Sequence, residues 1–150
     1  LATVMEEAAD NYRTVDIAID IEITGEPWVD TVPRHPEVLH GLANYIENAA
    51  DFAGTRVVVT GHWETDSLTM KVSDDGPGFA PGILTRLGEP YVTSRRLNDD
   101  GGGGMGLGVF IAKTLLERTG ARVKFGNHRG GGAEVVITWP RSALGGKERR

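Results

Sequence analysis

The chain has no cysteine, no long apolar run and no excess of basic residues. Zero cysteines among 150 residues exclude disulfide frameworks, thiolate zinc sites and cysteine nucleophiles, and four scattered histidines leave little for metal ligation. No apolar stretch approaches the ~20 residues of a membrane-spanning helix, and the start, LATVMEEAAD, lacks the basic-then-apolar order of a signal peptide. The net charge of −5 argues against nucleic acid or an anionic membrane as a partner. We therefore expect a cytoplasmic chain, or the cytosolic piece of something larger.

The length fits a single domain. Domains cluster near roughly 100–150 residues, and the sequence shows no internal repeat and no linker. We therefore predict one domain over residues 1–150, with a core at about 14–140. The tail RSALGGKERR (141–150) is polar, and we expect it to be frayed and flexible.

Glycine is the residue in excess. The chain has 21 glycines, where average usage of ~7% predicts about 10. Ten lie between Gly76 and Gly108, and four more lie between Gly126 and Gly132. Because glycine costs chain entropy, a local concentration indicates backbone that must approach a ligand or move.

Alternation with a period of two predicts the strands. In TVDIAIDIEIT (14–24) apolar residues occupy every second position from Val15 to Ile23, which is typical of a half-buried strand. The segments on either side of Thr65–Asp66 read as a β-hairpin with a two-residue turn. The predicted strands are 14–24, 28–32, 56–64, 67–75, 122–127 and 133–140.

Spacing near 3.6 residues predicts two long amphipathic helices, over 35–53 and 105–121, the second ended by Gly120. Between 76 and 104 the chain is irregular apart from a short helical stretch, PGILTRLG, and such a segment is typically functional or disordered. The hairpin, the terminal strand pair and the helices predict an α/β two-layer sandwich. Its sheet would be mixed, largely antiparallel and covered on one face by helices.

A polar stripe runs along the helix predicted at 35–53. His40, Asn44 and Asn48 are spaced i, i+4, i+8 and therefore stack on one side. Histidine and asparagine are poor choices for an exposed helix face, which favours Glu, Lys and Gln. An asparagine amide oxygen can bind Mg²⁺, which takes a few protein oxygens and leaves its other positions to phosphate and water. The stripe therefore either lines a site or is a solvated face.

Asp74 ends a predicted strand just before Gly76-Pro-Gly78. An ionised carboxylate only accepts hydrogen bonds, so it can receive one from an amino group such as the exocyclic amine of adenine. The neighbouring glycines would let a flat ring approach. The alternative is an aspartate that caps a turn and meets no ligand.

The segment DDGGGGMGLGVF (99–110) places six glycines at the start of a predicted helix, where free N–H groups and the helix dipole favour phosphate. A dinucleotide-binding fingerprint is excluded because the preceding TSRRLNDD is no strand. A P-loop is excluded because Ala112 occupies its required glycine position before Lys113. Arg95 and Arg96 precede the segment and could reach a terminal phosphate, or be ordinary surface arginines.

The order of these motifs resembles the ATP-binding catalytic domain of sensor histidine kinases, in the superfamily that also holds gyrase-type, Hsp90-type and MutL-type ATPases. The resemblance covers roughly residues 14–140 and implies the Bergerat ATP-binding fold; in its F and G2 boxes it is similar to RegB/PrrB-type redox-responding sensor kinases. The matching stretches are NYIENAADF (N box), DDGPGF (G1 box), LGEPYVTSR (F box), GGMGLGVFIAKTLLERTGA (G2 box) and the closing GGGAEVVITWP.

The resemblance implies a role for each matching residue. Asn48 would be the Mg²⁺ ligand, and Asn44 a neighbouring contact to phosphate or metal-bound water. Asp74 would read adenine and Phe52 would stack on it. Arg95, within an ATP lid over about 79–103, would assist at the γ-phosphate. The other implied contacts are Gly76 and Gly78 at the ring, and Gly104, Gly106, Leu107 and Gly108 at the phosphates.

Two positions depart from the family pattern. Asp51 stands where the family commonly has lysine, which would lower affinity for phosphate unless Arg95 or Arg96 compensates. Gly88 occupies the usual F-box phenylalanine position, which would weaken docking of the lid.

The resemblance further implies that ATP·Mg²⁺ donates its γ-phosphate to a histidine on a separate dimerising helical domain, which passes it to a response regulator. None of His35, His40, His62 or His128 lies in a matching histidine box. We therefore expect a monomeric catalytic fragment that binds nucleotide without autophosphorylating, and that touches neither nucleic acid nor membrane directly. The alternatives are a non-catalytic nucleotide-sensing or interaction module, an ATPase of the same superfamily, which Asn44 in place of a glutamate base disfavours, and an anti-sigma-type serine kinase.

Overall fold

A computed structural model describes residues 1–10, 12, 16–27, 35–79, 103–127 and 131–144. Its helices are α1 (Ala2–Asp10), α2 (Pro36–Phe52), α4 (Gly103–Arg118) and α5 (Arg141–Leu144). Its strands are β1 (Ala18–Gly25), β2 (Arg56–Trp63), β3 (Ser67–Asp74), β4 (Arg122–Asn127) and β5 (Ala133–Pro140). In this part of the chain, no helix is long and apolar enough to cross a lipid bilayer.

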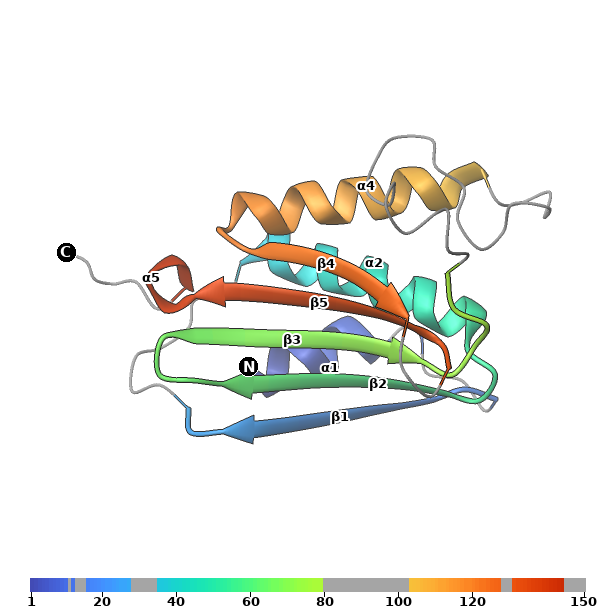
Figure 1. Cartoon of the computed structure of the whole chain (residues 1–150), viewed down its shortest axis with the longest axis horizontal. Coiled ribbons are helices and arrows are strands. Elements are labelled where there is room, and N and C mark those ends of the chain that lie inside the picture. The colour runs from blue at the N-terminus through green and yellow to red at the C-terminus, as the bar shows by residue number, and fades with distance from the viewer. Residues whose placement is uncertain (11, 13–15, 28–34, 80–102, 128–130, 145–150) are drawn as a thin grey trace.

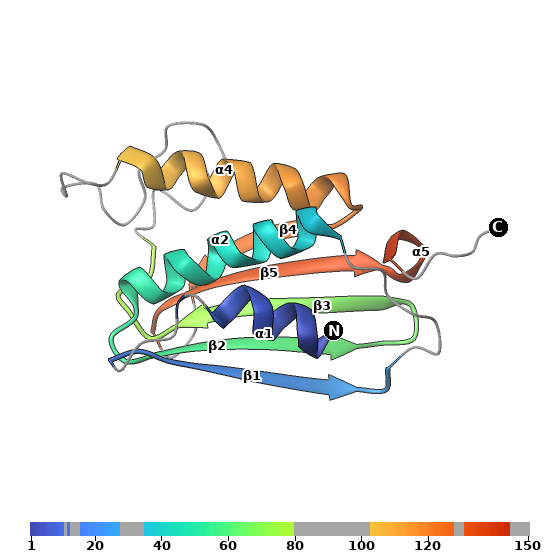
Figure 2. The ribbon, with the colours of Figure 1, turned by 180° about the vertical axis from the view of Figure 1, so that it is seen from behind.

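The strands form one sheet in the order β1-β2-β3-β5-β4. β1 pairs with β2 in parallel, and every other pair is antiparallel. A parallel pair needs a long crossover, which contains α2, whereas β2 and β3 are joined by a tight hairpin. Figure 1 shows the sheet in front of the helices, and Figure 2, from behind, shows α1, α2 and α4 over its other face. The predicted two-layer α/β arrangement is confirmed.

The core lies between the sheet and the helices. Along β2, β3 and β5 buried residues alternate with more exposed ones, so one face of each strand points at the helices. The most buried large side chains include Trp139, Leu68, Met70, Ile137 and Val59. The sequence pattern thus predicts which face of these strands is buried.

Helices α2 and α4 pack closely against each other over the sheet. α2 begins with Pro36 and buries Val38, Leu42, Tyr45, Ile46 and Ala49, as its periodicity predicts. A Cβ at Gly41 would lie 2.6 Å from the Cγ atom of Leu116, so glycine is what permits this approach of the two helices. α4 ends two residues before Gly120, whose φ of +94° suits glycine.

Two helices are absent from the sequence prediction. α1 buries Met5, Ala8 and Ala9 against α2 and the sheet, so the core extends beyond the predicted 14–140 boundary. α5 begins at Arg141, whose backbone N–H donates to the carbonyl of Asp66, and buries Leu144. The expectation that the chain frays from residue 141 is therefore wrong for 141–144, because one apolar side chain anchors this turn.

The N-terminal strand is shorter than its alternating pattern. β1 begins at Ala18, and its burial declines along the strand until Ile23 is 38% exposed. β1 is an edge strand, so its far end has fewer neighbours than the central strands have. The strand predicted at 28–32 and the helical stretch PGILTRLG lie outside the described residues.

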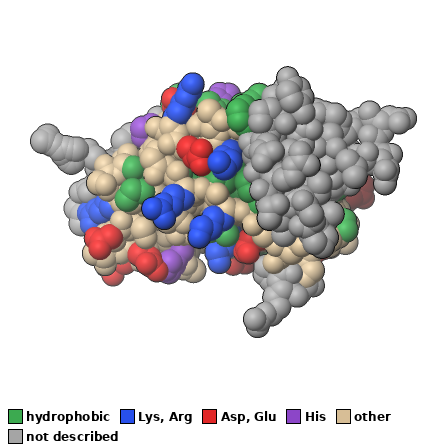
Figure 3. Space-filling view, turned by 45° about the horizontal axis from the view of Figure 1, so that its top comes forward, with side chains coloured by type: hydrophobic (Ala, Val, Ile, Leu, Met, Phe, Trp, Pro, Cys, Tyr) green, Lys and Arg blue, Asp and Glu red, His purple; other side chains and the backbone are tan. Residues whose placement is uncertain are grey.

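None of the described helices lies on the other face of the sheet, which we call the open face (Figures 1 and 2). Its side chains alternate with the buried ones and are mostly hydroxyl-bearing or charged, for example Asp20 on β1, Lys71 on β3 and Glu134 on β5. In Figure 3 acidic and basic side chains are interspersed over the described surface, with hydrophobic ones scattered among them. The open face is the face of the sheet that carries Asp20, Lys71 and Glu134.

Candidate functional site

The predicted site residues gather at one end of the molecule. The C-terminal end of α2, the C-terminal end of β3 and the N-terminal end of α4 all lie on the right in Figure 1 and on the left in Figure 2. These three ends carry, in turn, Asn48 of the polar stripe, the first aspartate of DDGPGF and the glycines of the G2-like segment, whereas Asn44 lies at the middle of α2. The fold therefore brings together segments that are far apart in the sequence.

The asparagine stripe has two differently placed members. Asn44 donates from Nδ2 to the carbonyl of His40 at 3.1 Å, one helical turn earlier, and His40 itself is exposed. The Oδ1 atom of Asn48 is buried and has no hydrogen-bond partner among the described residues. A buried acceptor without a partner costs roughly 1–3 kcal/mol, so this oxygen is suited to receive a donor or a cation.

Asp74 is the buried carboxylate among the described residues, with 6% exposure. Its Oδ1 accepts hydrogen bonds from the backbone N–H groups of Gly76, at 2.9 Å, and Ala133, at 3.3 Å. The first bond closes the turn after β3, and the second joins that turn to the first residue of β5. The predicted turn-capping role is therefore present, and burial also gives this carboxylate a fixed direction.

The fold itself requires a glycine at position 78, after Asp74. Gly78 has a φ of +82°, and a Cβ there would lie 2.8 Å from Oδ1 of Asn127. Asn127 accepts from the N–H of Phe79 at 2.7 Å and donates to its carbonyl at 3.0 Å. The Phe79 ring meets Phe125 edge to face. The motif predicts ring approach for Gly78 but gives no signal for Asn127, whose partner is 48 residues away.

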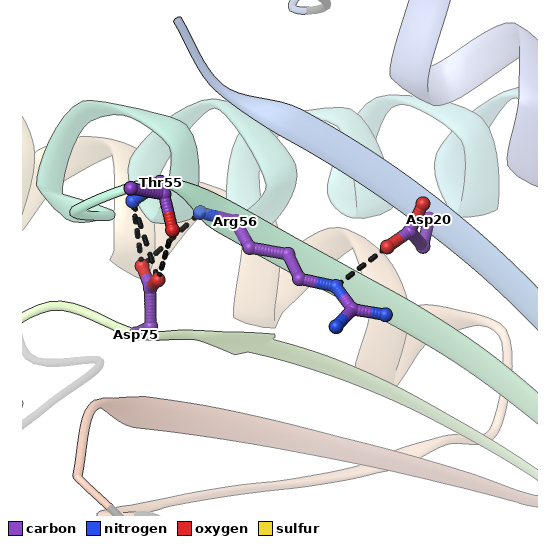
Figure 4. A network of polar contacts seen from close by, with 4 residues as sticks. All are labelled: Asp20, Thr55, Arg56 and Asp75. Carbon is purple, nitrogen blue, oxygen red and sulfur yellow. Dashed lines mark hydrogen bonds and ion pairs between the residues drawn. The ribbon is translucent and has the colours of Figure 1, made fainter.

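Asp75 makes a second set of bonds, which the sequence analysis also missed. Its carboxylate accepts from the N–H group of Gly54 at 2.7 Å. It also accepts from the N–H groups of Thr55 and Arg56 at 3.0–3.2 Å and from the Thr55 hydroxyl at 2.7 Å (Figure 4). These bonds, led by the one from the Thr55 hydroxyl, hold the pKa of the Asp75 carboxyl well below its usual range. Arg56 directs its guanidinium instead to Asp20 on β1.

The G2-like glycines lie inside the helix. α4 begins at Gly103, two residues earlier than predicted, so Gly104 and Gly106 fall among its first four residues and Leu107 and Gly108 follow in the next turn. The backbone N–H groups of the first four helical residues have no partner within the helix. Arg95, Arg96, Gly88 and most of the predicted lid lie outside the described residues.

The end of α2 also carries the aromatic and acidic positions singled out in the sequence. Phe52 is the last residue of α2 and is half-buried, and Asp51 is exposed. Tyr12, which follows α1, lies near this acidic end of the helix. Burial, and then the charges of Glu47 and Asp51, raise the pKa of the Tyr12 hydroxyl. The acidic end of α2 thus has a neutral phenol nearby.

A groove of about 680 Å³ on the open face borders the same end of the sheet. Its lining includes Arg56, Lys71, Ser73, Asp75 and Glu134, with charges of both signs. Asp74, a residue of the predicted site, also lines the groove, whereas no described residue of α2 or α4 does. The groove therefore shares the end of β3 with the predicted site but does not include its helices.

Comparisons with known proteins show the family of this chain. Residues 35–143 match the family described as histidine kinase-, DNA gyrase B-, and HSP90-like ATPase. The chain is 38% identical to sensor histidine kinase RegB of Cereibacter sphaeroides, over 93% of this chain and 35% of that protein. It thus spans about a third of the length of this relative.

Solved structures show the same fold. The mycobacterial sensor histidine kinase MprB superposes with a TM-score of 0.74 at 23% identity, covering 93% of this chain and 94% of that one. Full-length ShkA in complex with AMPPNP superposes with a TM-score of 0.65 at 24% identity, covering 99% of this chain and 29% of that one. With the family match and the RegB likeness, these findings show that the chain belongs to the histidine kinase-, DNA gyrase B- and HSP90-like ATPase family, as an ATPase-type catalytic domain of the sensor histidine kinase kind.

Proposed function

We propose that this domain binds ATP with Mg²⁺ and donates the γ-phosphate to a histidine of a separate helical dimerisation and phosphoacceptor domain of the same kinase. The observation that carries the proposal is the buried, unpartnered Oδ1 of Asn48, at the end of the molecule where β3 presents the buried Asp74. The AMPPNP named with ShkA is an ATP analogue, which supports nucleotide as the ligand class.

The donor set suits a magnesium ion bound together with phosphate. Mg²⁺ takes oxygen ligands and keeps several positions for water and phosphate, so one amide oxygen from the protein is enough. Asn48 would supply that oxygen, and its Oδ1 would gain the partner it lacks. When bound, the ion would offset the negative charge of the phosphates.

The other residues would bind and orient the nucleotide. Asp74 would accept a hydrogen bond from the adenine amine, with its direction set by the Gly76 and Ala133 N–H groups. Phe52 would cover the ring. The first N–H groups of α4, including those of Gly104 and Gly106, would donate to phosphate oxygens, with Leu107 and Gly108 close behind. Arg95 would stabilise charge at the γ-phosphate.

Asn44 favours transfer over hydrolysis. An amide cannot take a proton from water as a carboxylate base does, and its Nδ2 already donates to the His40 carbonyl. Catalysis would then rest on position and charge, and the acceptor would be the histidine that is brought to the site.

The partners and location follow from the same proposal. The relatives named above are longer than this chain, so the phosphoacceptor domain would belong to another part of the same kinase, with a response regulator as the next acceptor. We propose a cytoplasmic location, as the cytosolic portion of a membrane-anchored sensor, and a monomeric domain without nucleic-acid or membrane contact.

Calorimetric titration of ATP and ADP, with Mg²⁺ and with EDTA, tests the proposal on the chain as it stands. We expect Asp74→Asn to lower ATP affinity about 100-fold, because it loses a charged acceptor of the adenine amine. We expect Asn48→Ala to remove mainly the gain in affinity that Mg²⁺ provides.

The matched control is Asp66→Asn, which alters an exposed aspartate in the turn at the other end of the β2–β3 hairpin and should leave affinity unchanged. If the parent does not bind ATP at millimolar concentration, the proposal is wrong. The exposed Asp51, at a position where the family has lysine, would then favour an interaction module.

A further inference from the structure

The turn that joins α2 to β2 is short, and one carboxylate binds its backbone N–H groups. Three residues, 53–55, separate Phe52 from Arg56. The last helical bond runs from the Ala53 N–H to the Ala49 carbonyl. After it, the N–H groups of Gly54, Thr55 and Arg56 all converge on the carboxylate of Asp75. The path of the chain out of α2 is thus set by a side chain of another element.

Asp75 stands one residue beyond the last rung of the β2–β3 ladder. Val57 pairs with Asp74, and the Asp75 N–H donates to the Arg56 carbonyl at 3.3 Å. Backbone and side chain of Asp75 therefore both bind the 54–56 turn, and they do so at the open end of the hairpin. We call this set of contacts the Asp75 clamp (Figure 4).

The two elements that the clamp joins carry the two halves of the proposed nucleotide site. Asn48 and Phe52 lie in the last turns of α2, and Asp74 is the residue directly before Asp75. A shift of the 54–56 turn would move the asparagine oxygen relative to the adenine-reading carboxylate. Displacements of about 1 Å can cost a site on the order of 100-fold.

We propose that Asp75 is a positioning residue of the nucleotide site: by holding residues 54–56 it fixes the end of α2, with Asn48 and Phe52, relative to Asp74. Asp75 itself contacts neither nucleotide nor metal, and it acts through the backbone that it binds. The proposal rests on the proposed function, because it assigns Asn48 and Asp74 to one ligand.

The test variant is Asp75→Asn, which keeps the shape but replaces one accepting oxygen with an N–H donor facing other N–H groups. We expect its affinity for ATP·Mg²⁺ to fall about 10-fold to 100-fold, the range typical of losing a partner that orients a ligating residue. The affinity measured with Mg²⁺ divided by that measured with EDTA should also fall. The reason is that Asn48 would no longer lie at the right distance from Asp74 to bind the metal of the same nucleotide.

Two controls separate positioning from general stability. Asp20→Asn removes the ion pair between β1 and Arg56 without touching the 54–56 turn, and it should leave affinity within about twofold. Thr55→Val removes only the hydroxyl bond, and it should give a smaller loss than Asp75→Asn. All titrations are made well below the unfolding temperature of each variant, and hydrogen exchange of the Gly54, Thr55 and Arg56 amides is followed in parallel.

The outcomes are distinct. Faster exchange at these amides together with weaker, less Mg²⁺-dependent binding supports the clamp. A folded Asp75→Asn with faster exchange and parental affinity overturns it, while Asp74→Asn still lowers ATP affinity about 100-fold and the proposed function stands. A parent that does not bind overturns both. If Asp75→Asn does not fold, parental affinity in Thr55→Val overturns the clamp, and a graded loss supports it.

Discussion

Asp74 and Asp75 are adjacent and chemically identical, yet their surroundings differ completely. Asp74 is buried and binds N–H groups of its own turn and of β5, whereas Asp75 is exposed and binds the turn after α2. Their side chains leave the strand end in opposite directions, as alternation along a strand requires. The proposed adenine-reading residue, Asp74, is therefore followed directly by Asp75, which binds the turn after α2.

The Asp75 clamp predicts a specific dependence of stability on pH. The folded pKa of this carboxyl lies below its ordinary value of 3.8, so the ionised group stabilises the fold above that pH and loses this contribution as pH falls toward the folded pKa. We expect the difference in unfolding free energy between the parent and Asp75→Asn to be largest near neutral pH and smaller at pH 3. Urea unfolding of both proteins at pH 7, 5 and 3 measures it.

Comparing the two proteins removes the contribution of the other carboxylates, because these titrate in both. A difference that stays constant from pH 7 to pH 3 would contradict the clamp as a charge-dependent contact. It would indicate that only the shape of the side chain matters at position 75.

At the scale of elements, the end of β3 depends on glycine at the start of β5. Gly132 has a φ of +97°, and a Cβ there would collide with the backbone carbonyl oxygen of Asp74. We expect Gly132→Ala to lower the unfolding free energy by about 2 kcal/mol or more, since strain at such a φ alone costs about 1–3 kcal/mol. Denaturant titration measures the loss, and ATP affinity should fall with it because Asp74 is displaced.

Gly131 is the matched control for this prediction. It has a similar φ of +108°, but a Cβ there would meet no atom within 4 Å. Gly131→Ala therefore reports the strain alone, and Gly132→Ala reports strain plus collision. Equal losses in the two variants would show that the contact with Asp74 contributes nothing.

Most elements can be predicted from sequence periodicity, because their burial is regular. The two C-terminal strands were predicted with the bounds they have, and α2 begins and ends within one residue of its prediction. α1 was missed because nine residues give little periodicity, although Met5, Ala8 and Ala9 have the i, i+3, i+4 spacing of a buried helix face. β1 begins later than predicted because the sequence does not reveal that its partner β2 begins only at Arg56, opposite Ala18.

The site residues are predicted from local motifs, but the contacts that hold these residues in place cannot be predicted in that way. The bonds between Asp74 and Ala133, between Asp75 and Gly54, and between Asn127 and Phe79 join residues 59, 21 and 48 positions apart. Such pairs depend on strand order and register, which a single sequence does not give. The positions of Asn48 and Asp74 in the fold thus add a physical basis for a site that the sequence only suggested.

At the scale of the whole molecule, Asn48, Asp74 and the start of α4 lie at one end of a two-layer domain, and we expect no histidine of this chain to be the phosphoacceptor. His40 is exposed on α2, and His62 lies on the open face, where its Nδ1 is 2.7 Å from the Thr24 hydroxyl. We expect the isolated chain to bind ATP without becoming phosphorylated. Incubation with radiolabelled ATP, followed by a test for acid-labile phosphate, measures this.

Addition of the phosphoacceptor domain from the same full-length kinase supplies the positive control for this prediction. Labelled phosphate should then appear on that domain and be lost in the Asn48→Ala variant. Label on His40 or on any other histidine of the isolated chain would contradict the assignment of a separate acceptor.

The open face also has a practical consequence for experiments. Because the chain has no cysteine, one cysteine introduced there gives a single attachment point for a fluorophore. Arg122 is suitable: it is exposed at the start of β4, at the end of the sheet opposite Asp74 (Figure 1). A dye at this position would report tumbling of the whole domain, and thus docking onto a larger partner, without occupying the end that carries the asparagine and aspartate residues.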